Sequence, residues 1–180
     1  MPLLGEPPIQ TTALAKSLTR GSDLTWESLK QILYNECCED LVCCHKSGLS
    51  REANVQPEWL LDFVSLDRET LAMKLAVESE LALNMPQRLD DFEKLMSIKA
   101  PLKLFIYCTR NETESADVRR SLEGYLQRFS QHIEGEEYLL MDMDVNQKSA
   151  AFHQYRVPES GKIHEISFVP LPLERSSAAS

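Results

Sequence analysis

Two strand-like segments joined by a very short turn constrain the fold of this chain more than any other feature. Residues 57–67 (PEWLLDFVSLD) carry apolar side chains at odd and even positions, and residues 71–81 (LAMKLAVESEL) follow almost at once. Strands so close in sequence pair in the antiparallel sense, because a parallel pair needs a crossover connection of about a dozen residues or more. The sequence therefore predicts a β-hairpin, and the apolar residues on both faces of its first strand place it inside a sheet.

The second strand of this hairpin divides its side chains unequally between the two faces of the sheet. Side chains alternate along a strand, so odd and even positions point in opposite directions. The odd positions from 71 to 81 are almost entirely apolar, whereas the even positions combine small alanines with Lys74, Glu78 and Glu80. Buried carboxylates need an ionic partner, a hydrogen bond or a metal ion. This pattern therefore indicates either a binding site or a face that is open to solvent.

The other segments complete the prediction of an α/β sandwich around a mixed sheet. Helices are expected over 22–48, 85–100 and 113–133, and further strands over 101–109, 136–145 and 161–173. In the first helix, Leu29, Leu33, Cys37, Leu41 and Cys44 recur at helical spacing and form the expected core stripe. The length of 180 residues suits one domain, expected over 21–172, with an extended or mobile segment before it (1–20) and a disordered tail after it (173–180).

The charge and hydropathy of the chain limit the partners that it is expected to have. A net charge of −9 argues against a broad electrostatic grip on nucleic acid or on a membrane, although a local basic groove is compatible with it. The sequence holds no apolar run near the length of about 20 residues that spans a bilayer. It also lacks the pattern of an export signal at its start, so a cytoplasmic protein is expected.

Four of the five cysteines lie in the segment CCEDLVCCH, which ends at His45. A zinc site there is disfavoured, because two Cys–Cys pairs four residues apart do not have the spacing of zinc ligands. Reduced cysteines that line a buried helix face are the favoured interpretation.

A different metal is expected at the hairpin. Glu78 and Glu80 project from one face of their strand, and Asp62 joins them if its strand lies alongside with its even face on the same side. Three carboxylates in one concavity repel one another unless a cation holds them together. Surroundings that are rich in oxygen and poor in nitrogen and sulfur favour Mg²⁺, Mn²⁺ or Ca²⁺ over zinc.

These residues resemble the PD-(D/E)XK nuclease superfamily, which is also called restriction endonuclease-like. The resemblance consists of Asp62 in PEWLLDFVSLD and of Glu78, Ser79 and Glu80 in AVESE, and it covers roughly residues 24–145. Within the superfamily the chain looks most like small bacterial proteins that have a VESE strand followed by an FEKL…KAPLKL segment. The resemblance implies a three-layer fold with an αβββαβ-type core, and a nuclease that depends on Mg²⁺ or Mn²⁺.

The resemblance also implies roles for individual residues. Asp62 and Glu78 are expected to bind the metal ion, and Glu80 stands where the superfamily more often has lysine, so it would bind metal or accept a proton from water. Lys94 and Lys99 are the candidates for a lysine that has moved to another position, although a helical wheel favours a solvated Lys94. Glu36 is a candidate additional acid, with a salt bridge at the helix flank as the alternative.

The predicted function is therefore hydrolysis of phosphodiester bonds in nucleic acid, with DNA the expected substrate. The alternative is a catalytically inactive member of the same fold that acts as a binding or interaction protein, which the acidic balance and Glu80 favour. A third interpretation leaves the acids on an exposed face with no role. The family also suggests a homodimer, because cutting both strands often takes two sites. Asp142 and Asp144 form a second acidic pair, which a strand end that opens to solvent explains.

Overall fold

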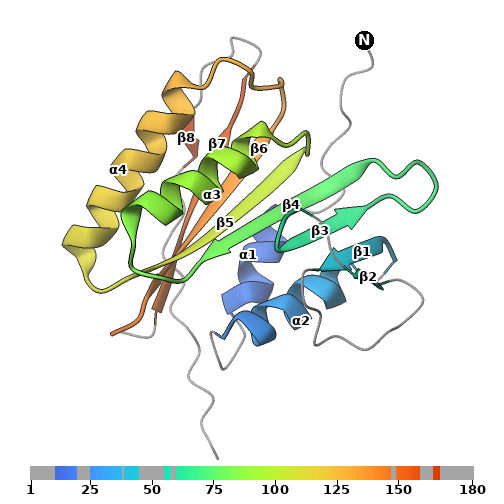
Figure 1. Ribbon diagram of the computed structural model, residues 1–180, viewed down its shortest axis with the longest axis horizontal. Helices are drawn as coiled ribbons and strands as arrows, with labels where there is room; N and C mark the ends of the chain where they lie inside the picture. The colour runs from blue at the N-terminus through green and yellow to red at the C-terminus, as the bar shows by residue number, and fades with distance from the viewer. Residues whose placement is uncertain are drawn as a thin grey trace, which may run out of the picture.

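The computed structural model describes residues 11–19, 25–37, 39–44, 55–57, 60–146, 149–158 and 164–166. Helices and strands alternate irregularly along these residues (Figure 1). The elements in chain order are α1 (Thr11–Thr19), α2 (Trp26–Glu36), β1 (Leu41–Cys44), β2 (Val55–Pro57), β3 (Phe63–Leu66), β4 (Met73–Glu80), α3 (Met85–Ser97), β5 (Leu102–Thr109), α4 (Glu112–Arg128), β6 (Glu137–Asp144), β7 (Ser149–Arg156) and β8 (His164–Ile166).

The described strands form one mixed sheet in the order β2-β1-β3-β4-β5-β6-β7-β8. The three central strands β4, β5 and β6 run parallel to one another, and the connections between them pass through α3 and α4. On either side, β3 and β7 pair antiparallel with the parallel core. The prediction of an α/β protein with a mixed sheet flanked by helices is therefore confirmed.

The predicted hairpin is present as β3 and β4. The two strands pair antiparallel, with Phe63 opposite Val77 and Ser65 opposite Leu75. Asp67 stabilises the turn, since its Oδ1 accepts hydrogen bonds from the backbone amides of Glu69 and Thr70 at 3.1 and 2.9 Å. One detail differs from the expectation: β3 begins at Phe63, so Asp62 immediately precedes the strand.

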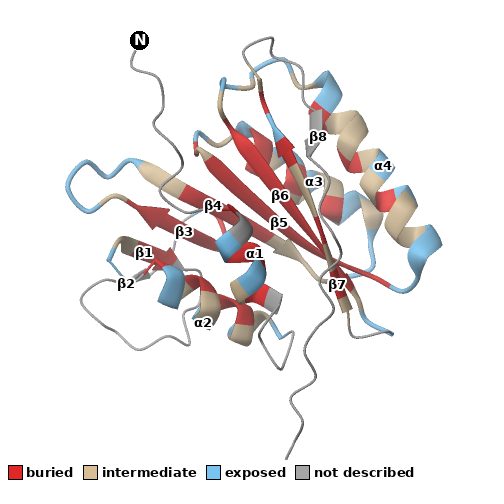
Figure 2. Ribbon diagram, turned by 180° about the vertical axis from the view of Figure 1, so that it is seen from behind, coloured by how far each residue is buried: buried red, intermediate tan, exposed pale blue. Residues whose placement is uncertain are grey.

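The two faces of the sheet bury separate apolar cores, one beneath each pair of helices. Helices α1 and α2 cover the face that is turned toward the viewer in Figure 2, and their apolar residues pack with Leu75 and Val77 of β4. Helices α3 and α4 cover the opposite face, where Ala76 of β4 is buried. The odd and even positions of β4 therefore point into different cores, as the alternation predicts.

The first segment of the chain differs from the expectation of an extended or mobile lead-in. Thr11–Thr19 is the helix α1, and Leu14, Ala15 and Leu18 are fully buried against the sheet. A helix of nine residues offers only two turns of periodicity, which is too short a pattern to stand out in a sequence. Residues 1–10 and the expected tail at 173–180 lie outside the described residues.

The expected long helix over 22–48 is wrong beyond its first half. Helix α2 ends at Glu36, and Leu41–Cys44 forms the strand β1. Val42 and Cys43 are buried in opposite cores, which is the alternation of a strand. Leu29, Leu33 and Cys37 do form the buried stripe of the helix. The prediction failed because Leu41 and Cys44 continue the helical spacing of that stripe while belonging to the next element.

The carboxyl-terminal half follows the sequence more closely, with one omission. Helix α4 begins at Glu112, where the side chain of Asn111 caps it, and it ends at Arg128 rather than continuing to 133. The strand β7 was not expected, because its sequence SAAFHQYR contains few large apolar residues. Among the described residues, no helix is both long enough and apolar enough to cross a membrane.

Candidate functional site

Glu78 is the most deeply buried of the acids that the sequence singles out. It lies near the carboxyl end of the central strand β4, and its side chain is 2% exposed. Helix α3, which follows β4 after a short loop, places Lys94 Nζ 2.5 Å from Glu78 Oε1. Apart from this ion pair, Oε1 has no hydrogen-bond partner among the described residues. Lys94 is 34% exposed and also reaches Asp91 Oδ1 at 3.2 Å, so the helical wheel that favoured a solvated lysine was misleading.

Burial dominates the electrostatics of Glu78. Removal from water raises the pKa of this carboxyl group to about 8, although the hydrogen bond with Lys94 works in the opposite direction. The negative charge of Asp62 also raises the pKa of Glu78, although by less than burial does. Burial lowers the pKa of Lys94, but Glu78 and Asp91 outweigh it, and the pKa of Lys94 rises above its ordinary value. The two shifts are compatible, because Glu78 is already ionised at the pH where Lys94 titrates.

Asp62 is held in place by the strand opposite. Its Oδ2 accepts hydrogen bonds from the backbone amide and the hydroxyl of Ser79, at 2.9 and 2.7 Å. Ser79 is an odd position of β4, on the face that α1 and α2 cover. Asp62 therefore turns toward the α2 side of the sheet, while Glu78 faces α3.

Glu80 and Asp62 meet in a cavity of about 390 Å³ at the carboxyl end of β4. Glu80 is the last residue of the strand, and its Oε1 accepts a hydrogen bond from the backbone amide of Ala82 at 2.7 Å. The other lining residues are Trp26, Glu27 and Lys30 of α2, together with Ser79, Leu81 and Ala82. The cavity thus lies between the first turns of α2 and the end of the hairpin.

The structure brings the predicted acids together in pairs and not as one cluster. Asp62 lines the cavity together with Glu80, and its negative charge raises the pKa of Glu78. Among the residues that the structure describes, no three or more His, Cys, Asp or Glu side chains are arranged to hold a metal ion. Asp62 is bonded to Ser79 and Glu80 to its own loop, which explains why the third carboxylate does not converge. A metal ion at these residues stays a prediction.

The donor chemistry of Asp62 and Glu78 suits a hard cation, but an ion shared by both requires the Asp62 side chain to leave Ser79 and turn toward Glu78. Both side chains offer carboxylate oxygens, which Mg²⁺ and Mn²⁺ prefer. Burial raises the pKa of Glu78 because it disfavours the charged carboxylate, and a divalent ion would stabilise that charged form. Glu80 fits less well in this conformation, because Ala82 already occupies one of its oxygens.

Other residues that the sequence proposed lie elsewhere. Glu36 is exposed at the end of α2 and does not line the cavity, where Glu27 of the same helix takes its place. Lys99 is exposed beyond the end of α3. Lys74 forms an ion pair at 2.5 Å with Asp40, which lies between α2 and β1.

The sequence did not single out Lys30, and it predicted the wrong surroundings for Asp142. The side chain of Lys30 is only 2% exposed, yet this lysine lines the cavity beside Asp62 and Glu80. The sequence feature that could have pointed to Lys30 is its position four residues after Trp26, which places both side chains on the same helix face. Asp142 is also buried, and it accepts hydrogen bonds from Thr109 and Ser115, so a solvent-facing strand end does not explain it. Burial raises its pKa, which these two hydrogen bonds oppose.

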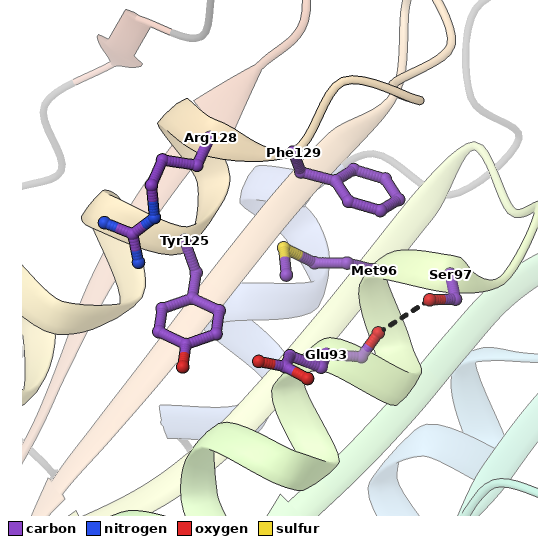
Figure 3. Close-up of a pocket in the computed structure, with 6 residues that line it drawn as sticks. All are labelled: Glu93, Met96, Ser97, Tyr125, Arg128 and Phe129. Carbon is purple, nitrogen blue, oxygen red and sulfur yellow. Dashed lines mark hydrogen bonds between the residues drawn. The ribbon is translucent and has the colours of Figure 1, made fainter.

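A second cavity lies between α3 and α4 and contains none of the predicted site residues. It has a volume of about 260 Å³, and Figure 3 shows the six side chains that line it. The guanidinium of Arg128 lies 4.9 Å from the ring centre of Tyr125, and Ser97 donates a hydrogen bond to the Glu93 carbonyl at 2.9 Å. This cavity is therefore separate from the acids of β4.

Comparison of the chain with protein-family models, with curated proteins and with solved structures finds no match.

Proposed function

We propose that this protein is a metal-dependent nuclease of the restriction endonuclease-like fold that hydrolyses phosphodiester bonds of nucleic acid, with DNA as the first substrate to test. The observation that carries the proposal is Glu78, a buried carboxylate with a pKa of about 8 that lies next to Lys94 and within the field of Asp62. Strongly shifted acids beside a specific charged partner are typical of catalytic sites. The order α2, β1, β3, β4, α3, β5 supports the fold proposal, because it follows the αβββαβ pattern with β2 added at the edge.

Each residue then has a role that its chemistry allows. Glu78, joined by Asp62 once that side chain leaves Ser79, would hold a divalent ion, which when bound lowers the pKa of water and stabilises negative charge on the phosphate. Lys94 supplies a positive charge beside Glu78 that offsets charge on the reacting phosphate. Glu80 cannot supply positive charge, so its proposed role is to accept a proton from the attacking water.

The shifted pKa of Glu78 makes the proposal sensitive to pH. Below pH 8 the buried carboxyl group mostly carries a proton, and a bound cation has to displace that proton. Affinity for Mg²⁺ or Mn²⁺ is therefore expected to increase as the pH rises toward 8. This dependence distinguishes a site at Glu78 from a site made only of exposed acids, which are ionised well below neutral pH.

A cleavage assay on single-stranded and duplex DNA with Mg²⁺ or Mn²⁺ tests the proposal. Glu78→Gln and Lys94→Met are each expected to lower the rate by about 100-fold or more, because each removes a charged group at the reacting phosphate. Glu93→Gln is the matched control, since Glu93 lies exposed on the same helix and its substitution should leave the rate unchanged. Equal cleavage by the wild type and both site variants would identify a contaminating nuclease and refute the proposal.

The second candidate function is a catalytically inactive member of this fold that binds a partner. It is favoured by the ion pair that Glu78 already makes with Lys94 and by the lack of a three-acid metal cluster among the described residues. Calorimetry with Mn²⁺ separates the two functions. The nuclease proposal expects heat of binding with the wild type that Glu78→Gln abolishes, whereas the inactive alternative expects no heat with either protein.

A further inference from the structure

The cavity between α2 and β4 contains a positive charge that the proposed reaction does not use. Lys30 is almost fully buried, although lysine is rarely buried unless its ammonium has a partner. Its Nζ lies 2.8 Å from Glu27 Oε1 and 5.7 Å from the ring centre of Trp26. Both of these residues line the cavity, so the ammonium group lies at the cavity wall.

The partner of Lys30 is held much less firmly than Lys30 itself. The side chain of Glu27 is 68% exposed, whereas that of Lys30 is 2% exposed. An ion pair with so exposed a carboxylate contributes little to stability, because water competes for it. An anionic ligand can therefore displace Glu27 at small cost and leave Lys30 where the helix has placed it. The carboxylate oxygen of Glu27 marks the position that a phosphate oxygen would take.

The remaining walls suit the other parts of a nucleotide. Trp26 is half-buried, packs in part against the core on the α1 and α2 face, and also lines the cavity, where a nucleobase of any sequence can stack on it. Ser79 and the short residue Ala82 complete the wall near Asp62 and Glu80. A cavity of about 390 Å³ falls within the range of small-molecule sites, which begins at about 300 Å³. It is far too small to hold a double helix.

We propose that this cavity binds one nucleotide of a single-stranded nucleic acid, with Lys30 holding a phosphate oxygen and Trp26 stacking on the base. The proposal rests on the proposed function for its placement beside the scissile phosphate and names the substrate class of that site. Single strands are favoured over duplex because the chain has a net charge of −9 and thus little means to neutralise a long run of duplex phosphates. One buried lysine and one aromatic ring beside the acids act on a single nucleotide instead.

Fluorescence anisotropy with a labelled oligothymidylate, with Ca²⁺ in place of Mg²⁺ and with the oligonucleotide checked for integrity, tests this inference. Lys30→Met is expected to weaken binding of the single strand by about 10-fold and to lower the slope of log affinity against log salt by about 0.7, which is the loss of one phosphate contact. Lys30→Arg should restore most of the affinity. Lys99→Met is the matched control, because it removes the same charge from an exposed position outside the cavity.

A second variant covers the case in which loss of the buried lysine impairs folding. Ala82→Trp fills the cavity from an exposed position and should abolish binding without disturbing either core. Binding by Ala82→Trp and Lys30→Met that equals the wild type, or a preference for the same sequence as a duplex, would overturn the inference. The two proposals fail separately. Metal-dependent cleavage that Lys30→Met leaves unchanged refutes only the proposal that the cavity binds a nucleotide. Single-strand binding that depends on Lys30 in a protein without nuclease activity supports only the cavity.

Discussion

Two buried charges lie on the same face of the central sheet, and their surroundings differ sharply. Lys103, near the amino end of β5, is fully buried, and its ammonium donates to Met96 O at 3.0 Å, to Glu136 Oε1 at 3.1 Å and to Tyr138 Oη at 3.0 Å. Glu78, near the carboxyl end of the neighbouring strand β4, has Lys94 as its ionic partner at 2.5 Å. The ammonium of Lys103 thus uses all three of its donors.

The difference shows which buried charge is available to a ligand. The network around Lys103 is closed, since Tyr138 also donates to Glu136 Oε2 at 3.3 Å and contacts His132 Nδ1 at 3.2 Å. The pair of Glu78 and Lys94 is open, because Lys94 remains 34% exposed. A closed network of this kind holds the structure together, whereas an open one leaves a charge for a substrate or an ion to complete.

The largest effect is expected when the closed network is broken. Lys103→Met leaves the carboxylate of Glu136 buried without its ionic partner, and this should lower the free energy of unfolding by about 3–5 kcal/mol. Urea denaturation followed by circular dichroism measures the change. The double variant Lys103→Met with Glu136→Gln removes both charges and should recover part of the loss. If the single variant lowers the free energy of unfolding by less than about 1 kcal/mol, the Lys103 network does not stabilise the fold in the way that its closed hydrogen bonds predict.

The open pair should reveal itself in the pH dependence of stability. In the folded protein Glu78 titrates at about pH 8, against 4.5 for an ordinary glutamate. Between these values the folded protein binds more protons than the unfolded chain, so this group lowers the free energy of unfolding as the pH rises from 4.5 to 8. Glu78→Gln removes that decline. As the pH rises from 4.5 to 8, the free energy of unfolding of the variant should increase by about 2 kcal/mol relative to that of the wild type.

Urea denaturation at a series of pH values measures this difference between wild type and variant. Glu93→Gln, on the exposed face of α3, should give a difference that does not change with pH, because Glu93 is exposed. A constant difference for Glu78→Gln as well would mean that Glu78 is ionised in the folded protein at neutral pH, and the contrast between the two regions would disappear.

The sequence predicts the architecture best where one periodicity dominates. The alternation in β4 and the helical stripe of α3 gave the hairpin, the central strands and the layer that covers them. The prediction from periodicity failed at β1, where Leu41 and Cys44 extend a helical spacing by coincidence. It also failed at α1, which is too short to show a period. In both places the packing against the sheet decides the local structure, and that information lies far away in the chain.

The candidate site was predictable in its members but not in its contacts. Parity predicts Glu78 and Glu80 on one face of the sheet, but Glu80 ends the strand and lines the cavity beside α2, while Glu78 meets Lys94 of α3. The resemblance selected Lys94 against the helical wheel. Parity could not predict the hydrogen bond from Ser79 to Asp62, because that contact depends on Asp62 lying just before β3 and not within it. Lys30 was missed because a lysine on an amphipathic helix ordinarily points to solvent.

The smallest expected effect sharpens the account of the open pair. Asp91 lies one turn before Lys94 on α3, accepts a hydrogen bond from it at 3.2 Å, and raises the pKa of Glu78 through its negative charge. Asp91→Asn removes that charge and leaves Lys94 to Glu78, so the pKa of Glu78 should fall below its present value of about 8. Carbon-detected NMR of the glutamate carboxyl groups follows the titration directly. The free energy of unfolding at neutral pH should change by no more than about 0.5 kcal/mol, because the Asp91–Lys94 pair is partly exposed.

Asp90→Asn, at an exposed neighbouring position, should leave the titration of Glu78 unchanged. If both variants leave it unchanged, the charge around Glu78 is set by burial and Lys94 alone, and Asp91 has no part in the open pair.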